Sequence, residues 1–200
     1  MTNEDCIDWS SNYKLKLADF KKKSDDKKSV IKGLEKRQCF SYVAYKIKWE
    51  ENDGVGKRMV REIKLKTVFD RNKSFFDLTQ AQKDGISQEV IDFLVLHEQG
   101  HFDLAEESRK KMEREISSRV KGKVFSVRDS DLEEESSDIE KFVSDVFVEI
   151  VKKEFEELHS RYDRRTNHGM NKPIQIEYNK RFKQLRQLRR REEKKLLRQK

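Results

Sequence analysis

A long stretch with helical periodicity is the feature that most constrains the fold of this chain. From Ser87 onward, apolar residues recur at helical spacing, and no proline interrupts the stretch until well past Ile116. The Ser87 hydroxyl is suited to cap the first turn. The sequence therefore predicts a helix of about 25 residues whose apolar face packs against another layer of the protein.

The predicted helix contains an H-E-x-x-H pattern at His97-Glu98-Gln99-Gly100-His101. Two histidines four residues apart project from the same side of a helix and can offer neutral nitrogen ligands to one metal ion. The glutamate is rotated by about 100° from the first histidine, so it can reach a water on the metal without binding the metal. The pattern predicts one Zn²⁺ ion on His97 and His101, with Glu98 as general base in hydrolysis at a carbonyl group.

A zinc site of this kind needs a third protein ligand, and the predicted helix does not provide one. Beyond His101 the same face carries two apolar residues and a serine, while Asp103 and Glu106 point away and suit a supporting role. No glycine follows His101 closely enough to turn the chain back toward the metal. The third ligand is therefore expected later in the chain, where the candidates are His168, Asp163, His159 and Glu154.

Two segments before the helix have the composition of strands. Residues 40–50 are rich in β-branched and aromatic side chains, and residues 58–70 alternate apolar with charged or bulky positions. Asp53-Gly54 lies between them and favours a turn. The sequence predicts an antiparallel hairpin with one face exposed to solvent.

Two further helices and a linker are expected after the metal motif. Residues 139–162 predict a second amphipathic helix, and residues 174–200 predict a third helix that becomes strongly basic. The acidic segment within 117–138 is interpreted as a mobile linker. Together these elements predict an α+β fold, in which a small antiparallel sheet packs on the motif helix beside a second long helix and a basic C-terminal helix.

The net charge of +8 is concentrated at the C-terminal end. Residues 180–200 hold eleven Lys/Arg and two Glu, which leaves 35 Lys/Arg against 36 Asp/Glu in the remaining chain. The interpretation is a domain over residues 1–180 followed by a basic helical tail over 181–200. Residues Lys180–Lys200 are a candidate contact for an anionic partner, either nucleic acid or a membrane surface. The sequence does not indicate an oligomeric state.

The sequence contains no apolar stretch that approaches the ~20 residues of a transmembrane helix. The first residues, MTNEDC, are acidic and lack the apolar core of a signal peptide. We therefore expect a cytoplasmic location for the chain as written, and a secreted one if a leader precedes it.

Two segments of the chain carry further specific residues. Residues 94–106 read LVLHEQGHFDLAE, and Tyr162–Gly169 reads YDRRTNHG. Both segments resemble the motifs of a bacterial family of predicted, mostly secreted, zinc-dependent proteases. The family has HEQGHFD followed by an AE pair, and later a Y-D-x-x-T-x-H-G element with a downstream glutamine, for which Gln175 is suitably placed. The similarity covers roughly residues 7–185, and only these two motifs are specific. The chain departs from the family in its strongly basic end and in the lack of a secretion signal.

The resemblance implies a zincin-like fold and a peptide or protein substrate. It also implies His168 as the third zinc ligand beside His97 and His101. Tyr162 or Tyr178 is a candidate donor to the oxyanion of the tetrahedral intermediate, although Tyr162 equally suits a buried core position. The leading hypothesis is a zinc metallopeptidase. The alternative is a non-catalytic, zinc-stabilised binding protein that uses its basic end.

Overall fold

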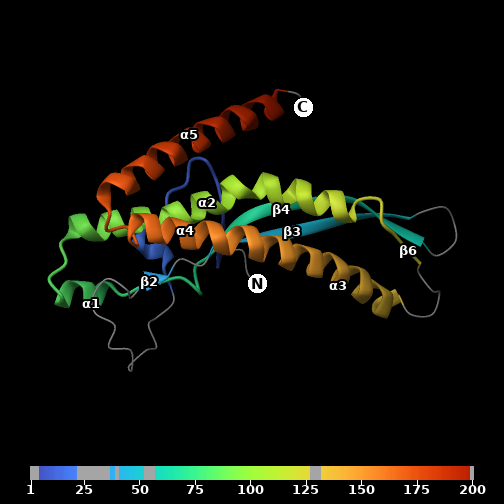
Figure 1. Ribbon diagram of the computed structural model, residues 1–200, viewed down its shortest axis with the longest axis horizontal. Helices are drawn as coiled ribbons and strands as arrows, with labels where there is room; N and C mark the ends of the chain where they lie inside the picture. Colours follow the sequence, from blue (N-terminus) through green and yellow to red (C-terminus); the bar gives the residue numbers. More distant parts are fainter. Residues whose placement is uncertain (1–4, 22–36, 39–40, 52–56, 127–131, 199–200) are drawn as a thin grey trace. The chain divides into compact units, whose positions relative to one another are not determined.

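The computed structural model describes residues 5–21, 37–38, 41–51, 57–126 and 132–198, and it combines long helices with short antiparallel strands (Figure 1). The strands are β1 (Cys6–Asp8), β2 (Arg37–Gln38), β3 (Ser41–Glu51), β4 (Lys57–Asp70), β5 (Phe75–Phe76) and β6 (Val124–Ser126). The helices are η1 (Leu17–Asp19), α1 (Leu78–Lys83), α2 (Gln88–Val120), α3 (Leu132–Val151), η3 (Lys152–Glu156), α4 (Glu157–Thr166) and α5 (Lys172–Leu197). This arrangement confirms the predicted α+β class.

The main sheet is built around β4. Its order is β1-β4-β3, and β6 also pairs with β4. The antiparallel register joins Ile7 to Phe69 at one end of β4 and Val124 to Met59 at the other. The two segments predicted to form a hairpin are therefore strands and neighbours in one sheet, while most of the predicted turn, residues 52–56, lies outside the described residues.

The chain divides into two compact units. One contains Met1–Tyr42, Thr67–Glu107 and His159–Lys200, and the other contains Val43–Lys66 and Ser108–Leu158. Both β4 and α2 contribute residues to each unit. The H-E-x-x-H motif and the later motif at 162–169 belong to the first unit, which is called the motif unit below.

The second unit buries one apolar cluster. It is formed by residues of β4, the distal half of α2 and α3. Its buried members are Val60, Ile63, Leu65, Met112, Ile116, Val120, Val143 and Ile150. Apolar side chains of β4 and of α2 pack against each other in this cluster, so the predicted packing of the helix on the sheet is confirmed.

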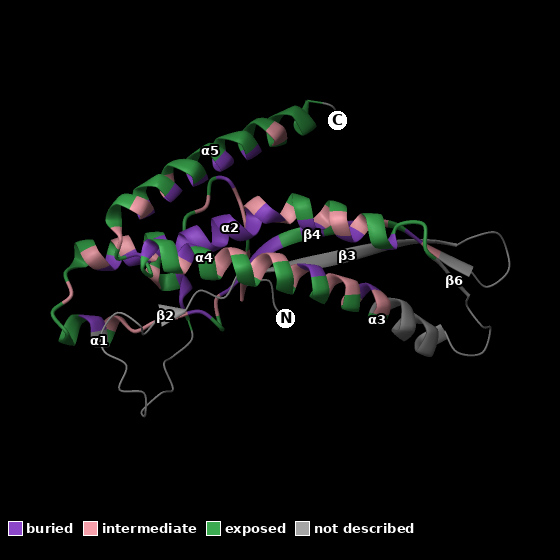
Figure 2. Ribbon diagram, in the orientation of Figure 1, coloured by how far each residue is buried: buried purple, intermediate pink, exposed green. Residues whose placement is uncertain are grey.

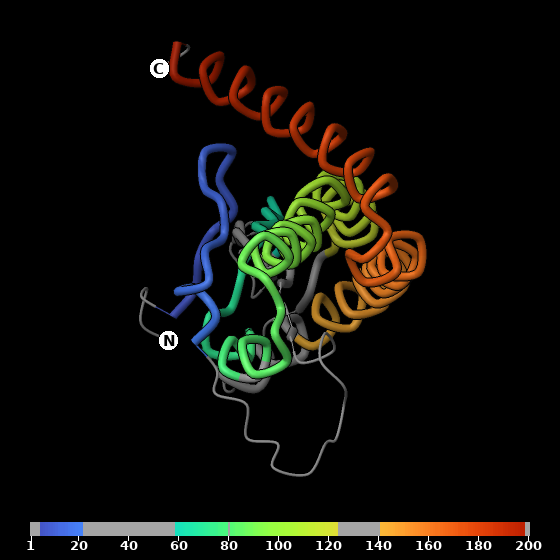
Figure 3. Tube along the Cα trace, turned by 90° about the vertical axis from the view of Figure 1, so that its left-hand side faces the viewer, coloured from blue at the N-terminus to red at the C-terminus, as the bar shows by residue number. Residues whose placement is uncertain are grey.

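The motif unit surrounds the proximal half of α2. On one side, Phe102 of α2 packs with Phe69 of β4 at 5.8 Å between ring centroids, in a cluster that includes Leu15 and Phe20. In Figure 3 the N-terminal segment (blue) and α4 (orange) lie on opposite sides of α2 (green). All ten residues from His97 to Glu106 are buried, as the purple stretch of α2 in Figure 2 shows. A helix that is covered all round must find a partner for every polar side chain it carries.

Much of the predicted linker over 117–138 has regular secondary structure, while its mobility stays a prediction. The helix α2 continues to Val120, Gly122 turns the chain at φ +76°, and β6 then pairs with β4. The next helix, α3, begins at Leu132, and only residues 127–131 lie outside the described part. Acidic composition predicted a linker, but the start of this segment pairs with a distant strand.

The second predicted helix, residues 139–162, is longer than predicted, whereas the C-terminal helix has about its predicted length. The described helical run from Leu132 to Thr166 contains one π-helical turn, Lys152–Glu156, between α3 and α4. The C-terminal helix α5 is capped at its N-terminus by Asn171, whose side chain accepts a hydrogen bond from the Ile174 amide. None of the helices in the described ranges is both long enough and apolar enough to cross a lipid bilayer.

Candidate metal centre

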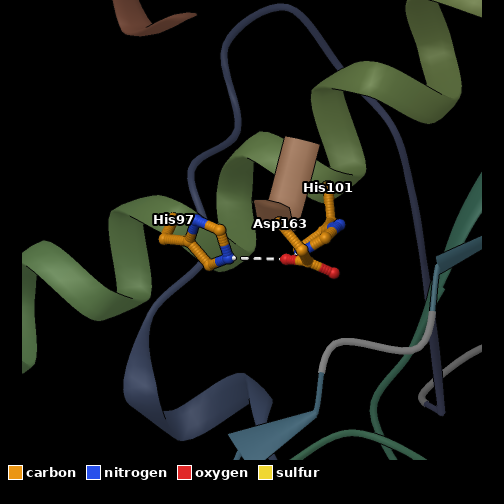
Figure 4. Close-up of side chains that lie close together, drawn as sticks. All are labelled: His97, His101 and Asp163. Carbon is orange, nitrogen blue, oxygen red and sulfur yellow. Dashed lines mark hydrogen bonds and ion pairs between the residues drawn. The ribbon is translucent and has the colours of Figure 1, made fainter. Parts of the chain in front are cut away.

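Three side chains converge on one point in the motif unit. His97 and His101 project from α2, and Asp163 reaches them from α4 (Figure 4). The Asp163 Oδ1 atom lies 3.2 Å from His97 Nε2 and 3.0 Å from His101 Nε2. One nitrogen from each histidine and one carboxylate oxygen all lie within 4.8 Å of one another. This grouping brings together both predicted histidine ligands and Asp163, one of the candidates for the third.

The spacing of these atoms suits a small tetrahedral ion. Zinc–nitrogen and zinc–oxygen bonds of ~2.0–2.1 Å place neighbouring ligand atoms about 3.3 Å apart. The Asp163 oxygen stands at nearly this distance from both Nε2 atoms. Two imidazole nitrogens and a carboxylate oxygen are also a ligand set that zinc accepts. The donor atoms of these three described residues are therefore of the kinds that could hold a zinc ion.

The charge of Asp163 favours a cation at this point. Burial raises the pKa of its carboxyl, but hydrogen bonds and positive charge from His101 and His97 outweigh burial and hold the pKa well below its usual range. The group is thus an ionised carboxylate, the form in which it can bind a metal. Its side chain is 28% exposed, whereas His97 is 1% exposed. The cluster consequently reaches solvent on the Asp163 side.

Gly100 allows α4 to approach the metal motif. A Cβ atom at this position would stand 2.6 Å from Cζ of Tyr162, and closer still to the tyrosine oxygen. With glycine there, the Tyr162 ring stacks on His97 at 4.7 Å between centroids and 9° between planes. The same ring meets His101 edge-on at 5.0 Å. Gly100 thus helps to position Asp163, because it lets Tyr162 approach α2 and Asp163 is the next residue in the chain.

Tyr162 itself is a core residue. It is fully buried, its hydroxyl donates to the His97 carbonyl at 3.2 Å, and Gln175 Nε2 donates to that hydroxyl at 2.7 Å. Burial raises the pKa of the hydroxyl, and the nearby Glu98 carboxylate raises it further. These contacts engage the hydroxyl within the protein, as the core alternative predicts, and the oxyanion role stays a prediction. Tyr178 is also buried and packs edge-on against Tyr162.

Glu98, the predicted general base, is a buried residue of the motif helix. It is buried at 4% exposure and follows His97 in the same helical turn. Its charge influences the Tyr162 hydroxyl, which lies against the His97 carbonyl. The role of Glu98 as general base stays a prediction.

His168 lies on the solvent side of the cluster. Its Nδ1 is 3.7 Å from Asp163 Oδ1, and its side chain is 69% exposed. The turn that carries it has three successive residues with positive φ, 47° at Asn167, 51° at His168 and 86° at Gly169. A Cβ atom at Gly169 would be 2.9 Å from His97 Cβ, so glycine permits the turn to cover that ring. The assignment of His168 as third ligand stays a prediction, since its ring is outside the converging group.

The two remaining candidates have other partners. The His159 ring lies beside the His101 ring at 5.0 Å between centroids, with its Nδ1 2.8 Å from His101 Nδ1. Burial, and then the neighbouring His101, lowers the pKa of His159 to about 3. Glu154 belongs to the second unit and forms an ion pair with Lys111 at 2.6 Å.

Asp103 links the motif helix to neighbouring segments, the supporting role expected from its place on the helix. It accepts hydrogen bonds from Trp9 Nε1 at 2.8 Å and from Gln99 Nε2 at 3.1 Å. The Arg186 guanidinium forms a two-point pair with the same carboxylate, through Nε at 3.1 Å and through Nη2. Gln99 also accepts from the Leu15 amide at 2.7 Å. The motif's interior glutamine therefore ties α2 to the N-terminal segment.

Glu106 repeats this arrangement one turn later. Arg189 Nε donates to Glu106 at 2.9 Å, and the Thr67 hydroxyl donates to its other oxygen at 3.0 Å. Arg189 is buried, as are Phe182 and Leu185 of the same helix. The interpretation of 181–200 as a tail outside the domain is thus modified, because the first part of this segment packs within the motif unit. The i, i+3 spacing of Asp103 and Glu106 matches that of Arg186 and Arg189, which was a readable signal in the sequence.

Comparisons of the chain with protein-family models, with curated proteins and with solved structures find no match.

Proposed function

We propose that this chain is a zinc-dependent hydrolase that cleaves peptide bonds. The observation that carries the proposal is the convergence of His97, His101 and Asp163, whose ligand atoms lie within 4.8 Å of one another. Glu98 supports it, because a site that only stabilised structure would need the ligands but no adjacent base. The exposure of Asp163 supports substrate access from one side.

The roles of the side chains follow from their positions. His97, His101 and Asp163 would hold the zinc ion, which would supply Lewis acidity and make water a stronger nucleophile near neutral pH. Glu98 accepts a proton from the attacking water and passes it to the nitrogen of the departing amine. Trp9, Gln99 and Arg186 hold the helix through Asp103 and do not touch the reacting atoms.

The test compares Glu98→Gln with the unchanged protein. Both are loaded with one equivalent of Zn²⁺, and cleavage of an unfolded protein substrate is followed by mass spectrometry. We expect Glu98→Gln to retain zinc and to lose hydrolysis by at least ~100-fold, the scale of a general base. The matched control is Glu107→Gln, on the same helix but paired with Arg181 at the surface; it should remain active. Full hydrolysis by Glu98→Gln would exclude the proposed mechanism.

A second candidate function is supported by the surface of α5. Its buried face carries Phe182, Leu185, Arg186 and Arg189, whereas its outer face is basic. The exposed cations of the described helix after Arg181 are Lys183, Arg190, Arg191, Lys194, Lys195 and Arg198. Such a face suits a polyanion, and a zinc-stabilised binding protein would use it without hydrolysis.

The binding candidate has its own measurement. A variant with Arg191, Lys194 and Lys195 all changed to Gln leaves the buried arginines in place. Affinity for a DNA duplex at two salt concentrations should fall in this variant, together with the salt slope, if the face binds phosphates. Equal affinity in both proteins would remove this candidate. Vesicles with anionic lipid are the parallel probe for a membrane surface.

A further inference from the structure

The second ring nitrogen of each motif histidine also has a specific neighbour. His97 Nδ1 lies 3.0 Å from Oε1 of Gln175, and His101 Nδ1 lies 2.8 Å from Nδ1 of His159. Meanwhile both Nε2 atoms face Asp163. A histidine has two nitrogens, and the partner of one decides which tautomer the ring adopts. Both rings therefore have their Nδ1 held from outside the metal cluster.

The direction of the Gln175 hydrogen bond follows from its other contacts. Its Nε2 donates to the Tyr162 hydroxyl at 2.7 Å and to Asn179 Oδ1 at 2.9 Å, so its oxygen is the atom that faces His97. An amide oxygen can only accept. His97 must therefore carry a proton on Nδ1. When a metal replaces the proton that Nε2 shares with Asp163, the ring is left as the Nδ1–H tautomer.

The direction of the contact between His101 and His159 follows from the metal assignment. Two imidazole nitrogens 2.8 Å apart share a single proton. If Nε2 of His101 binds the metal, Nδ1 carries that proton and His159 Nδ1 accepts it. The two ring planes are 13° apart and their centroids are 5.0 Å apart, so the two nitrogens meet close to the ring planes, where the N–H and the lone pair lie.

We propose that Gln175 and His159 are positioning residues that hold His97 and His101 as Nδ1–H tautomers, which leaves both Nε2 atoms available for the metal. This inference rests on the proposed function and adds two residues to it. The positions come from different elements, Gln175 from α5 and His159 from α4. Outer partners of metal-bound histidines contribute about 10–100-fold to metal affinity in comparable sites.

The test separates acceptor strength from ring packing. His159→Phe keeps a flat ring beside His101 but removes the acceptor nitrogen. His159→Gln lacks the ring but offers an acceptor oxygen. Gln175→Leu and Gln175→Glu form the second matched pair. Zinc affinity of the full chain is measured by competition with a chromophoric chelator, and long-range ¹H–¹⁵N spectra assign the protonated nitrogen of each histidine.

The expected result has two parts. In the zinc-loaded wild type, His97 and His101 both carry the proton on Nδ1. The Phe and Leu variants bind zinc about 10–100-fold more weakly, and the Gln and Glu variants recover most of this loss. Recovery by the acceptor-bearing variants identifies a positioning role, because a purely structural role would not depend on an acceptor atom.

Results that contradict the roles of Gln175 and His159 differ from results that contradict the proposed zinc site. Zinc bound through Nδ1 of either histidine in the wild type overturns this inference even if every variant fails to fold. Equal zinc affinity in wild type, His159→Phe and Gln175→Leu also overturns it while leaving the zinc site intact. A wild-type protein that binds no zinc overturns both proposals together.

Discussion

The ring of Tyr162 lies directly over Gly100, where a Cβ atom would come within 2.6 Å of the tyrosine Cζ. This close approach lets Tyr162 stack on His97 and brings the next residue, Asp163, to both histidines. The glycine in the H-E-x-x-H motif is therefore a packing requirement of this particular centre. The general pattern leaves that position open.

We expect Gly100→Ala to destabilise the protein although alanine is the better helix former. The gain in helix propensity is about 1 kcal/mol, whereas overpacking against a buried, hydrogen-bonded tyrosine costs about 1–3 kcal/mol or more. Zinc affinity should fall as well, because the displaced ring carries Asp163 with it. Urea unfolding and zinc competition measure the two effects. A stabilised variant with unchanged zinc affinity would contradict the packing described for Gly100.

A double variant isolates this contact. The change Tyr162→Leu removes the ring that the new methyl group meets, so its cost and the cost of Gly100→Ala should not add. A coupling free energy near zero would mean that the two residues do not meet.

We expect Asp103→Asn to destabilise the motif unit by about 3–5 kcal/mol, because Arg186 remains buried without its counter-charge. The control is Glu107→Gln, which breaks the ion pair with Arg181 between the same two helices. Arg181 is 52% exposed, so that change should cost less than about 1 kcal/mol. Free energies of unfolding from urea titrations compare the two. Equal losses of unfolding free energy would show that the buried pair stabilises the protein no more than the exposed pair does.

The third zinc ligand is open to a direct comparison of Asp163→Asn with His168→Ala. Asp163 lies in the converging group, and His168 is 69% exposed beside it. We expect Asp163→Asn to weaken zinc binding by more than ~100-fold, beyond what outer partners contribute. His168→Ala should change it far less. The reverse order would assign the site to His168, as the resemblance implied.

The sequence was sufficient for the features that depend on local spacing. The pair His97 and His101 is a single-helix pattern, and α2 begins at the predicted cap, where the Val90 amide donates to Ser87 Oγ at 3.4 Å. The strand alternation of β4 also follows from neighbouring residues. Such periodicities are recorded in the chain itself.

The sequence was insufficient where distant segments meet. Asp163 was one of four candidates, because its choice depends on how α4 packs on Gly100. His159 was another of these candidates, yet its Nδ1 faces Nδ1 of His101. Arg186 and Arg189 were assigned to a basic helical tail, since a run of basic residues does not by itself reveal buried carboxylates eighty-three positions away.

The most direct test of the metal centre is a titration of the metal-free protein with Zn²⁺, read by calorimetry and confirmed by elemental analysis. We predict one zinc ion per chain in the wild type, and no specifically bound ion in a variant that combines His97→Ala and His101→Ala. Circular dichroism would verify that both proteins remain folded. A wild-type protein without zinc, or a double variant that still binds one ion, would contradict the central claim.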